Sequence, residues 1–527
     1  MEHDRDLDLP EVDEHTARLS RRSLFQRAGL VIAAATLPTG VALAGQSTNP
    51  TAMAPADAAG RAAGQSTNPP AGAQPVSPAM EKLSTYMSEA RNHVLPDEVV
   101  QKTKQHILDT LAAQVSGSDL LPGRDAIRFV TGYGGKEVST VVASNVVCGP
   151  IEAALTNAML SHADETDDSH APSQSHPGCA VVPAALAAAE RFAVDGTTFL
   201  RSVTLGYDVG TRVMMTMGAQ GYEARTHRSS HSIVTIFGAA AAAGCAAKLN
   251  AQQVRWMLDY TAQQCSGLAA WHRDTQHIEK AFVFAGMGAR SGITSALVVE
   301  SGWTGLDDIF SGPDNFFMVF APHANPAGLV DKLGERYEVT RTNIKKWPVG
   351  SPIQAVLDAL VILQKRHPFN AGRVRHVTVR LATDEAAIVN NRVMPDICLQ
   401  QMVAVMLLDK TVTFRTANDA ALMKDPGILR QRARVTLIPD EQLQRLLPLR
   451  VGIVDLTLTD GTHLTQRVDN VRGTPENPMT RDEIETKARD LMTPILGATK
   501  TSALIGKVFS IENVKDVREL RPLLQRA

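Results

Sequence analysis

Cysteine is scarce in this chain of 527 residues, and its five copies are scattered. None belongs to a C-x-x-C pair, and their number is odd. The sequence therefore predicts neither a disulfide framework nor an iron–sulfur cluster. The five are Cys148, Cys179, Cys245, Cys265 and Cys398.

An excess of charge of either sign is also missing. Lys and Arg number 53 against 55 Asp and Glu, a formal net charge of -2, and aromatic residues make up 5% of the chain. We find no basic stripe interleaved with aromatics, so we expect no nucleic-acid partner. The apolar run at residues 28–44 is interrupted by Pro38 and Gly40 and is short for a membrane span, so we expect no stable membrane association.

The first 44 residues nevertheless resemble a twin-arginine export signal. Arg21 and Arg22 stand in the string SRRSLF, the apolar run follows, and residues 42–44 (ALA) form a small-x-small cleavage site before Gly45. This order predicts export of a folded protein to the periplasm, which suits a chain without disulfides. The alternative is a cytoplasmic protein whose tail contains an Arg-Arg pair by chance.

Residues 45–78 are poor in large apolar side chains. They consist mainly of Ala, Gly, Pro, Ser, Thr and Gln, and the string AGQSTNP occurs at 44–50 and again at 63–69. Such a segment buries too little apolar surface to offset the entropy lost on ordering. We therefore predict a disordered linker at residues 45–78.

The remaining chain predicts a mostly α protein: a large all-helical domain with a smaller α+β lid domain. Residues 79–340 are rich in apolar residues at helical spacing, and the alanine run at 236–249 indicates closely packed helices with a large partner surface. Residues 341–474 contain alternating strands and an Asp-Gly hairpin signal at 460–461. We expect residues 475–527 to return to the helical domain, beginning with a capping box at Thr480 and Glu483.

Titratable residues are concentrated in one stretch, residues 161–191, between two predicted helices. Its histidines and carboxylates could bind a divalent cation, but no H-x-x-x-H or H-E-x-x-H spacing occurs, so we predict no metal site. A solvated acidic loop is the simpler alternative. The possible ligands are His162, Asp164, Asp167, Asp168, His170 and His176.

An acid–base site is a further interpretation, because three later segments supply positive or titratable groups. His231, with His227 as an alternative, precedes the alanine-rich helix, where a helix N-terminus favours anions. His277 and Lys280 are three residues apart and so lie near each other on one helical face. Lys345 stands at the junction of the two predicted domains, where ligand clefts commonly form.

Five segments, in order, resemble the MmgE/PrpD family, which includes 2-methylcitrate dehydratase, cis-aconitate decarboxylase and iminodisuccinate epimerase. The resemblance covers residues 80 to 510 and implies the same two-domain fold, a homodimer, and metal-independent acid–base chemistry on small polycarboxylates without a cofactor. The segments are HADETDDSH, SSHSIVTIFGAAAAAGCAAKL, HIEKAFVFAGMGARSG, KKWPVGSPIQAVLDA and GTPENPMTRDEIETKARDL.

The resemblance also implies roles for individual residues. The implied catalytic residues are His176, His231, Lys280 and Asp168, and the expected substrate-binding residues are Glu165, Ser169, His170, Lys345, His277 and Gln401. Four positions differ from the family pattern: Glu165 replaces an aspartate, Ser169 a threonine, Gly178 a serine, and Gln401 the lid tyrosine of the decarboxylase.

Dehydration of a hydroxy acid needs a base for the C–H, an acid for the leaving hydroxyl, and cations for the carboxylates. The proposed residues provide all three, so we expect a hydro-lyase acting on a 2-methylcitrate-like hydroxy-polycarboxylate. The same groups could protonate a carbanion, so an epimerase or a decarboxylase is the alternative. The changes at Glu165 and Gln401, together with export, leave a non-catalytic polycarboxylate-binding protein as a third hypothesis.

Overall fold

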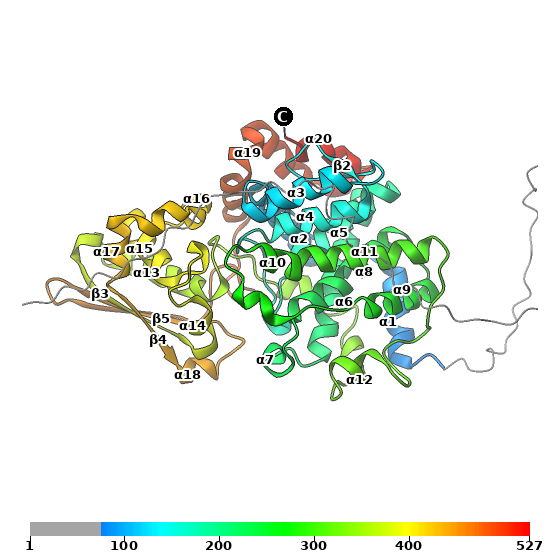
Figure 1. The fold of residues 1–527 in the computed structure, drawn as a ribbon, viewed down its shortest axis with the longest axis horizontal. Helices are drawn as coiled ribbons and strands as arrows, with labels where there is room; N and C mark the ends of the chain where they lie inside the picture. Colours follow the sequence, from blue (N-terminus) through cyan, green and yellow to red (C-terminus); the bar gives the residue numbers. More distant parts are fainter. Residues whose placement is uncertain (1–74, 527) are drawn as a thin grey trace, which may run out of the picture. The chain divides into compact units, whose positions relative to one another are not determined.

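The computed structural model describes residues 75–526, which are predominantly helical (Figure 1). This confirms the predicted fold class, a mostly α protein with a small sheet region. The helical part differs from the prediction in a short antiparallel ribbon of β1 (Ser139–Thr140) and β2 (Val147–Cys148). The predicted export signal and nearly all of the predicted linker lie outside the described residues.

The centre of the helical part is a set of helices that pack at very short distances. α8 (Ser230–Ala246) lies against α6 (Gly196–Thr216) and α11 (Met287–Glu300). A Cβ added at Gly210 would lie 2.3 Å from the backbone oxygen of Val234, so only glycine permits this approach. The alanine-rich sequence of α8 is thus explained by close helix contact on several sides.

The predicted lid contains a four-stranded sheet in the order β4-β3-β5-β6. β3 (Val374–Ala382) pairs in parallel with β4 (Val435–Asp440) and antiparallel with β5 (Gly452–Leu458). β5 then forms the predicted hairpin with β6 (His463–Val468), where Gly461 adopts a φ of 89° in the turn. Residues of α13 (Gln354–Arg366) and α15 (Leu399–Asp409) share one hydrophobic cluster with the strands.

The C-terminal segment packs on helices of the N-terminal half of the described chain. α19 (Arg481–Phe509) begins with the predicted capping box and continues beyond an irregular residue at Gly497. It packs on α2 (Asp97–Gly117), and the two helices share a buried ion pair of 2.6 Å between Lys487 and Asp109. The domain boundaries at 340 and 474 remain predictions, because the described residues belong to one compact unit.

One apolar helical run needs separate mention because it carries site residues. α10 (Ile278–Ala281), a π-helical turn at Phe282–Gly286 and α11 form a continuous stretch from 278 to 300. Among the described residues it alone is long and apolar enough to cross a membrane, yet 67% of its apolar window is buried in the protein. Single π-turns inside helices frequently mark functional sites.

Candidate active site

Residues of the helical part and of the lid together line a cavity of about 920 Å³. Much of its wall comes from the loop between α4 (Pro150–Ser161) and α5 (Gly178–Phe192), from the first turn of α8, and from the α10 and π-turn run. Predicted site residues that line it are Glu165, Ser169, His170, His176, His227, His231 and Lys280.

The acidic loop is buried, which contradicts the simple interpretation of a solvated acidic segment. Every residue from 162 to 170 is buried, and Asp167 is fully inaccessible. Asp164 fixes the turn by accepting hydrogen bonds from the backbone N–H (2.9 Å) and the hydroxyl (2.7 Å) of Thr166. Because buried charges need partners, the loop depends on the cations and imidazoles around it.

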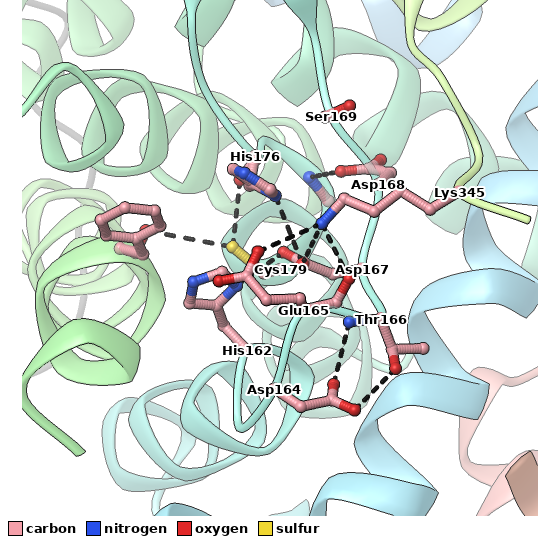
Figure 2. A network of polar contacts seen from close by, with 12 residues as sticks. His162, Asp164, Glu165, Thr166, Asp167, Asp168, Ser169, His176, Cys179 and Lys345 are labelled. Carbon is pink, nitrogen blue, oxygen red and sulfur yellow. Dashed lines mark hydrogen bonds and ion pairs between the residues drawn. The ribbon is translucent and has the colours of Figure 1, made fainter. Parts of the chain in front are cut away.

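Asp167 is the centre of one polar cluster, whose members point toward one another in Figure 2. Its carboxylate lies 2.9 Å from Nδ1 of His162, 3.3 Å from Nδ1 of His176 and 3.5 Å from Nζ of Lys345. Although burial acts to raise the pKa of Asp167, these neighbours hold it well below its usual value. Asp167 is therefore a fixed anion that orients two imidazoles.

Glu165 is the centre of a second cluster. Its carboxylate contacts Nζ of Lys280, lies 3.3 Å from Nε2 of His277 and 3.6 Å from Nζ of Lys345, while its backbone oxygen accepts a 2.8 Å hydrogen bond from Lys345. Burial acts to raise the pKa of Glu165, but Lys280, His277 and Lys345 hold it well below its usual value. The glutamate thus connects both predicted lysines.

His176 and His231 form a neutral imidazole pair on the same wall. Their ring centroids are 5.3 Å apart, and His231 stacks on Phe284 of the π-turn at 3.6 Å. Burial lowers the pKa of His176 to about 3 and also lowers the pKa of His231. Both rings are consequently neutral near neutral pH and can accept a proton. His227, the alternative to His231, is exposed at the cavity rim.

Ser169 and His170 line the cavity but are tied to neighbouring segments. Ser169 exchanges backbone hydrogen bonds of 3.0 and 2.8 Å with Asn343. His170 lies 2.8 Å from the Ser173 hydroxyl through Nδ1 and 3.3 Å from Glu338 through Nε2. Their bonds hold the loop against the segment that begins the lid.

Asp168 and Gln401 lie apart from the cavity. Asp168 contacts Nδ1 of His106 at 2.9 Å, the hydroxyl of Tyr207, and the backbone N–H of Gly178 at 3.0 Å, so it anchors the start of α5. A Cβ at Gly178 would lie 2.6 Å from this carboxylate, which explains the absence of the family's serine there. Gln401 is buried in α15 and accepts a 3.4 Å hydrogen bond from Arg432.

Three residues near the site escaped the sequence-based prediction. Phe284 supports His231, and Glu223 lies 3.4 Å from Nδ1 of His231. Asp396 of the lid is 4% exposed; burial raises its pKa to about 6, and the neighbouring Glu165 adds to the shift. The nearness of Glu223 and His231 in sequence was a usable signal, whereas nothing local distinguishes Asp396.

Two groups of side chains could in principle hold a metal ion. In each, the candidate ligand atoms lie within 4.8 Å of one another. However, the Glu165 carboxylate of one group already contacts Lys280, and the Asp167 carboxylate of the other lies close to Lys345. The negative charge that would attract a divalent cation is therefore already compensated. The groups are His162, Glu165 and His277, and His162, Asp167 and Cys179.

Comparison with known proteins identifies the class. The chain belongs to the MmgE/PrpD family: the MmgE/PrpD N-terminal domain matches residues 81–328 and the C-terminal domain matches residues 347–509. This confirms the family that the motifs indicate.

Among curated proteins, the chain is 23% identical over 480 residues to a cis-aconitate decarboxylase-like protein of Aspergillus oryzae, covering 84% of this chain and 96% of that protein. It is 24% identical over 467 residues to a cis-aconitate decarboxylase of Aspergillus terreus (82% and 92%) and 25% identical over 456 residues to that of Homo sapiens (82% and 91%).

Proposed function

We propose that this chain is a lyase that eliminates water from a small, 2-methylcitrate-like hydroxy-polycarboxylate, using only its own side chains as acid and base. The observation that carries the proposal is the imidazole pair His176 and His231, on the wall of one cavity with Lys280. Elimination across a carbon–carbon bond needs two proton-transfer groups on neighbouring positions of the substrate, and this pair can provide them.

The two imidazoles have different neighbours, which supports different roles. Burial keeps His176 neutral and so able to accept a proton, and the Asp167 carboxylate 3.3 Å from its Nδ1 would stabilise the imidazolium formed when it takes the proton from carbon. Burial lowers the pKa of His231, but the carboxylate of Glu223 beside Nδ1 opposes this effect and favours the protonated form that would deliver a proton to the leaving hydroxyl. General acid–base groups of this kind typically contribute about 10²–10⁴-fold in rate.

Lys280 and Lys345 supply the positive charge that such a reaction requires. Removing a proton next to a carboxylate produces enolate-like charge, which a buried ammonium stabilises strongly because little water screens it. The Lys280 side chain is 10% exposed and lines the cavity, so it suits the developing charge. Lys345 stands at the start of the lid and suits a site completed by lid closure.

Decarboxylation of a related acid is the second candidate, because the curated relatives are named as cis-aconitate decarboxylases. The same cations would stabilise the carbanion left by CO₂, and an imidazole would protonate it. Against it stands Gln401, which replaces the decarboxylase tyrosine and is bonded to Arg432 rather than lining the cavity. Epimerisation and binding without turnover remain alternatives. Export to the periplasm and a homodimer are further proposals.

A panel of 2-methylcitrate, citrate and cis-aconitate separates these candidates. The purified chain should produce a new conjugated double bond, seen as ultraviolet absorbance, from one or both of the hydroxy acids. Release of CO₂ would favour the decarboxylase, inversion of a stereocentre without a double bond the epimerase, and tight binding without product the binding protein.

A further inference from the structure

The cavity has no excess of positive charge, although a polycarboxylate is proposed to bind there. Four carboxylate residues line it, against three Lys or Arg residues. Histidines could add positive charge, but burial lowers the pKa of three of them, His170, His176 and His231. The acidic residues are Glu165, Glu223, Asp384 and Glu385, and the basic residues are Lys280, Arg392 and Arg450.

Two of the three lining cations are already paired within the protein. Lys280 contacts the carboxylate of Glu165, and Arg450 lies 3.1 Å from the carboxylate of Glu385. Lys345, which lines a neighbouring cavity instead of this one, is shared between Glu165 at 3.6 Å and Asp167 at 3.5 Å. A substrate carboxylate would have to displace an internal anion to reach any of these three side chains.

Arg392 is the exception among the lining cations. It lies in the lid between α14 (Thr383–Val389) and α15, and its guanidinium donates a 3.3 Å hydrogen bond to the backbone oxygen of His272 on the opposite side of the cavity. Within residues 75–526 no carboxylate lies within 4.0 Å of it. A guanidinium with remaining N–H groups is well suited to a carboxylate.

We propose that Arg392 anchors a substrate carboxylate and that Glu165 occupies, from within the protein, the place of another carboxylate at Lys280, so that the site takes acids with two carboxylates in preference to three. This inference rests on the proposed function and narrows its substrate class: hydroxy acids with two carboxylates would be preferred, and 2-methylcitrate and citrate, which carry three, would be the poorer substrates. Glu165 contacts Lys280, which lies 115 residues later in the sequence. The aspartate of the family pattern would be one methylene shorter at this position.

The energetics favour this division of roles. Pairing a third substrate carboxylate with Lys280 would leave Glu165 buried beside a second anion, a like-charge arrangement that is costly away from water. A second carboxylate bound at Arg392 meets no such competitor. The binding selectivity is thus set by one internal carboxylate and one free guanidinium.

Two saturated, non-reacting acids test the inference on the full chain by isothermal titration calorimetry: glutarate with two carboxylates and tricarballylate with three. Wild type should bind glutarate at least as tightly as tricarballylate. Arg392→Gln should weaken both by about tenfold or more, and Arg392→Lys should recover part of the loss. Glu165→Gln should tighten tricarballylate by about tenfold or more and change glutarate less.

Matched controls and opposing outcomes are available. Glu279→Gln removes a negative charge, as Glu165→Gln does, but from an exposed neighbour of Lys280. Arg273→Gln removes a positive charge, as Arg392→Gln does, but beside His272. Neither control should alter binding. Tighter binding of tricarballylate by wild type, unaltered binding by Arg392→Gln, or an unaltered preference in Glu165→Gln would overturn the inference. If Glu165→Gln fails to fold, Glu165→Asp should shift the preference the same way. Failure of wild type to bind either acid would instead overturn the proposed function.

Discussion

Nζ of Lys345 lies 2.8 Å from the backbone carbonyl oxygen of Glu165 and 3.5 Å from the carboxylate of Asp167. One lysine at the start of the lid therefore contacts two acidic residues of the loop between α4 and α5. The lid and this loop are joined at this point, and the charge of Lys345 also acts on His176.

Replacing Lys345 by methionine should therefore change the pH dependence as well as the rate. Lys345 lowers the pKa of His176, so its removal raises that pKa, and the acid limb of the kcat/KM profile should move to higher pH. Turnover should fall by about 10²-fold or more. The adjacent Lys346→Met is the control, since Lys346 lies 4.0 Å from Asp358 and away from the loop. An unshifted acid limb in Lys345→Met would contradict the assignment.

Alanine at His176 or at His231 should reduce turnover by about 10²–10⁴-fold while the circular dichroism spectrum stays the same. Lys280→Ala should likewise abolish turnover. His227→Ala should leave the rate close to wild type, because His227 is exposed at the rim rather than stacked on Phe284. Steady-state kinetics check all four variants. A severe loss in His227→Ala with a normal rate in His231→Ala would reverse the choice between the two histidines.

Glu223 should act as a positioning residue for His231. It lies 3.4 Å from Nδ1 of His231 and accepts a 2.9 Å hydrogen bond from the backbone of Ser230. Burial acts to raise the pKa of Glu223, but hydrogen bonds to His231 and His272 hold it well below its usual value, so it is an anion. Glu223→Gln should lower the pKa of His231 further, reduce kcat more than it raises KM, and move the alkaline limb to lower pH. A uniform loss without a change in the pH profile would indicate a purely structural role.

Asp396 should make stability depend on pH in the acidic range. Its pKa of about 6 lies above the unfolded value of 3.8, so the folded state binds more protons between these values and the free energy of unfolding falls as the pH rises. Asp396→Asn cannot ionise and should be more stable than wild type above about pH 6, by up to about 3 kcal/mol, with little difference near pH 4. Thermal unfolding at both pH values measures this; an equal difference at both would refute it.

Much of the fold could be predicted because its signals are local. The capping box at Thr480, the Asp-Gly turn before β6 and the alternation along β3 depend on neighbouring residues, and each is found at its expected place. The alanine-rich sequence of α8 indicated close helix packing, which the contact near Gly210 confirms. The short ribbon of β1 and β2 was missed, since strands of two residues leave almost no periodic pattern.

The site was harder to predict because burial and partners depend on the tertiary fold. Motif matching identified Glu165, His176, His231 and Lys280, which do line one cavity. It could not show that the Asp168 carboxylate already contacts His106 and Tyr207, since those partners come from distant helices. The raised pKa of Asp396 likewise arises mainly from burial, to which carboxylates far away in the sequence add, so no local pattern could indicate it.

Mass spectrometry of the products formed from 2-methylcitrate and citrate, with EDTA present throughout, tests the central claim most directly. The proposed mechanism predicts that wild type converts at least one of these acids into a product lighter by one water, at a rate that the chelator leaves unchanged, and that His176→Ala forms none. Unchanged acids, a product lighter by CO₂ instead of water, or activity that disappears with EDTA would contradict a protein-only dehydration.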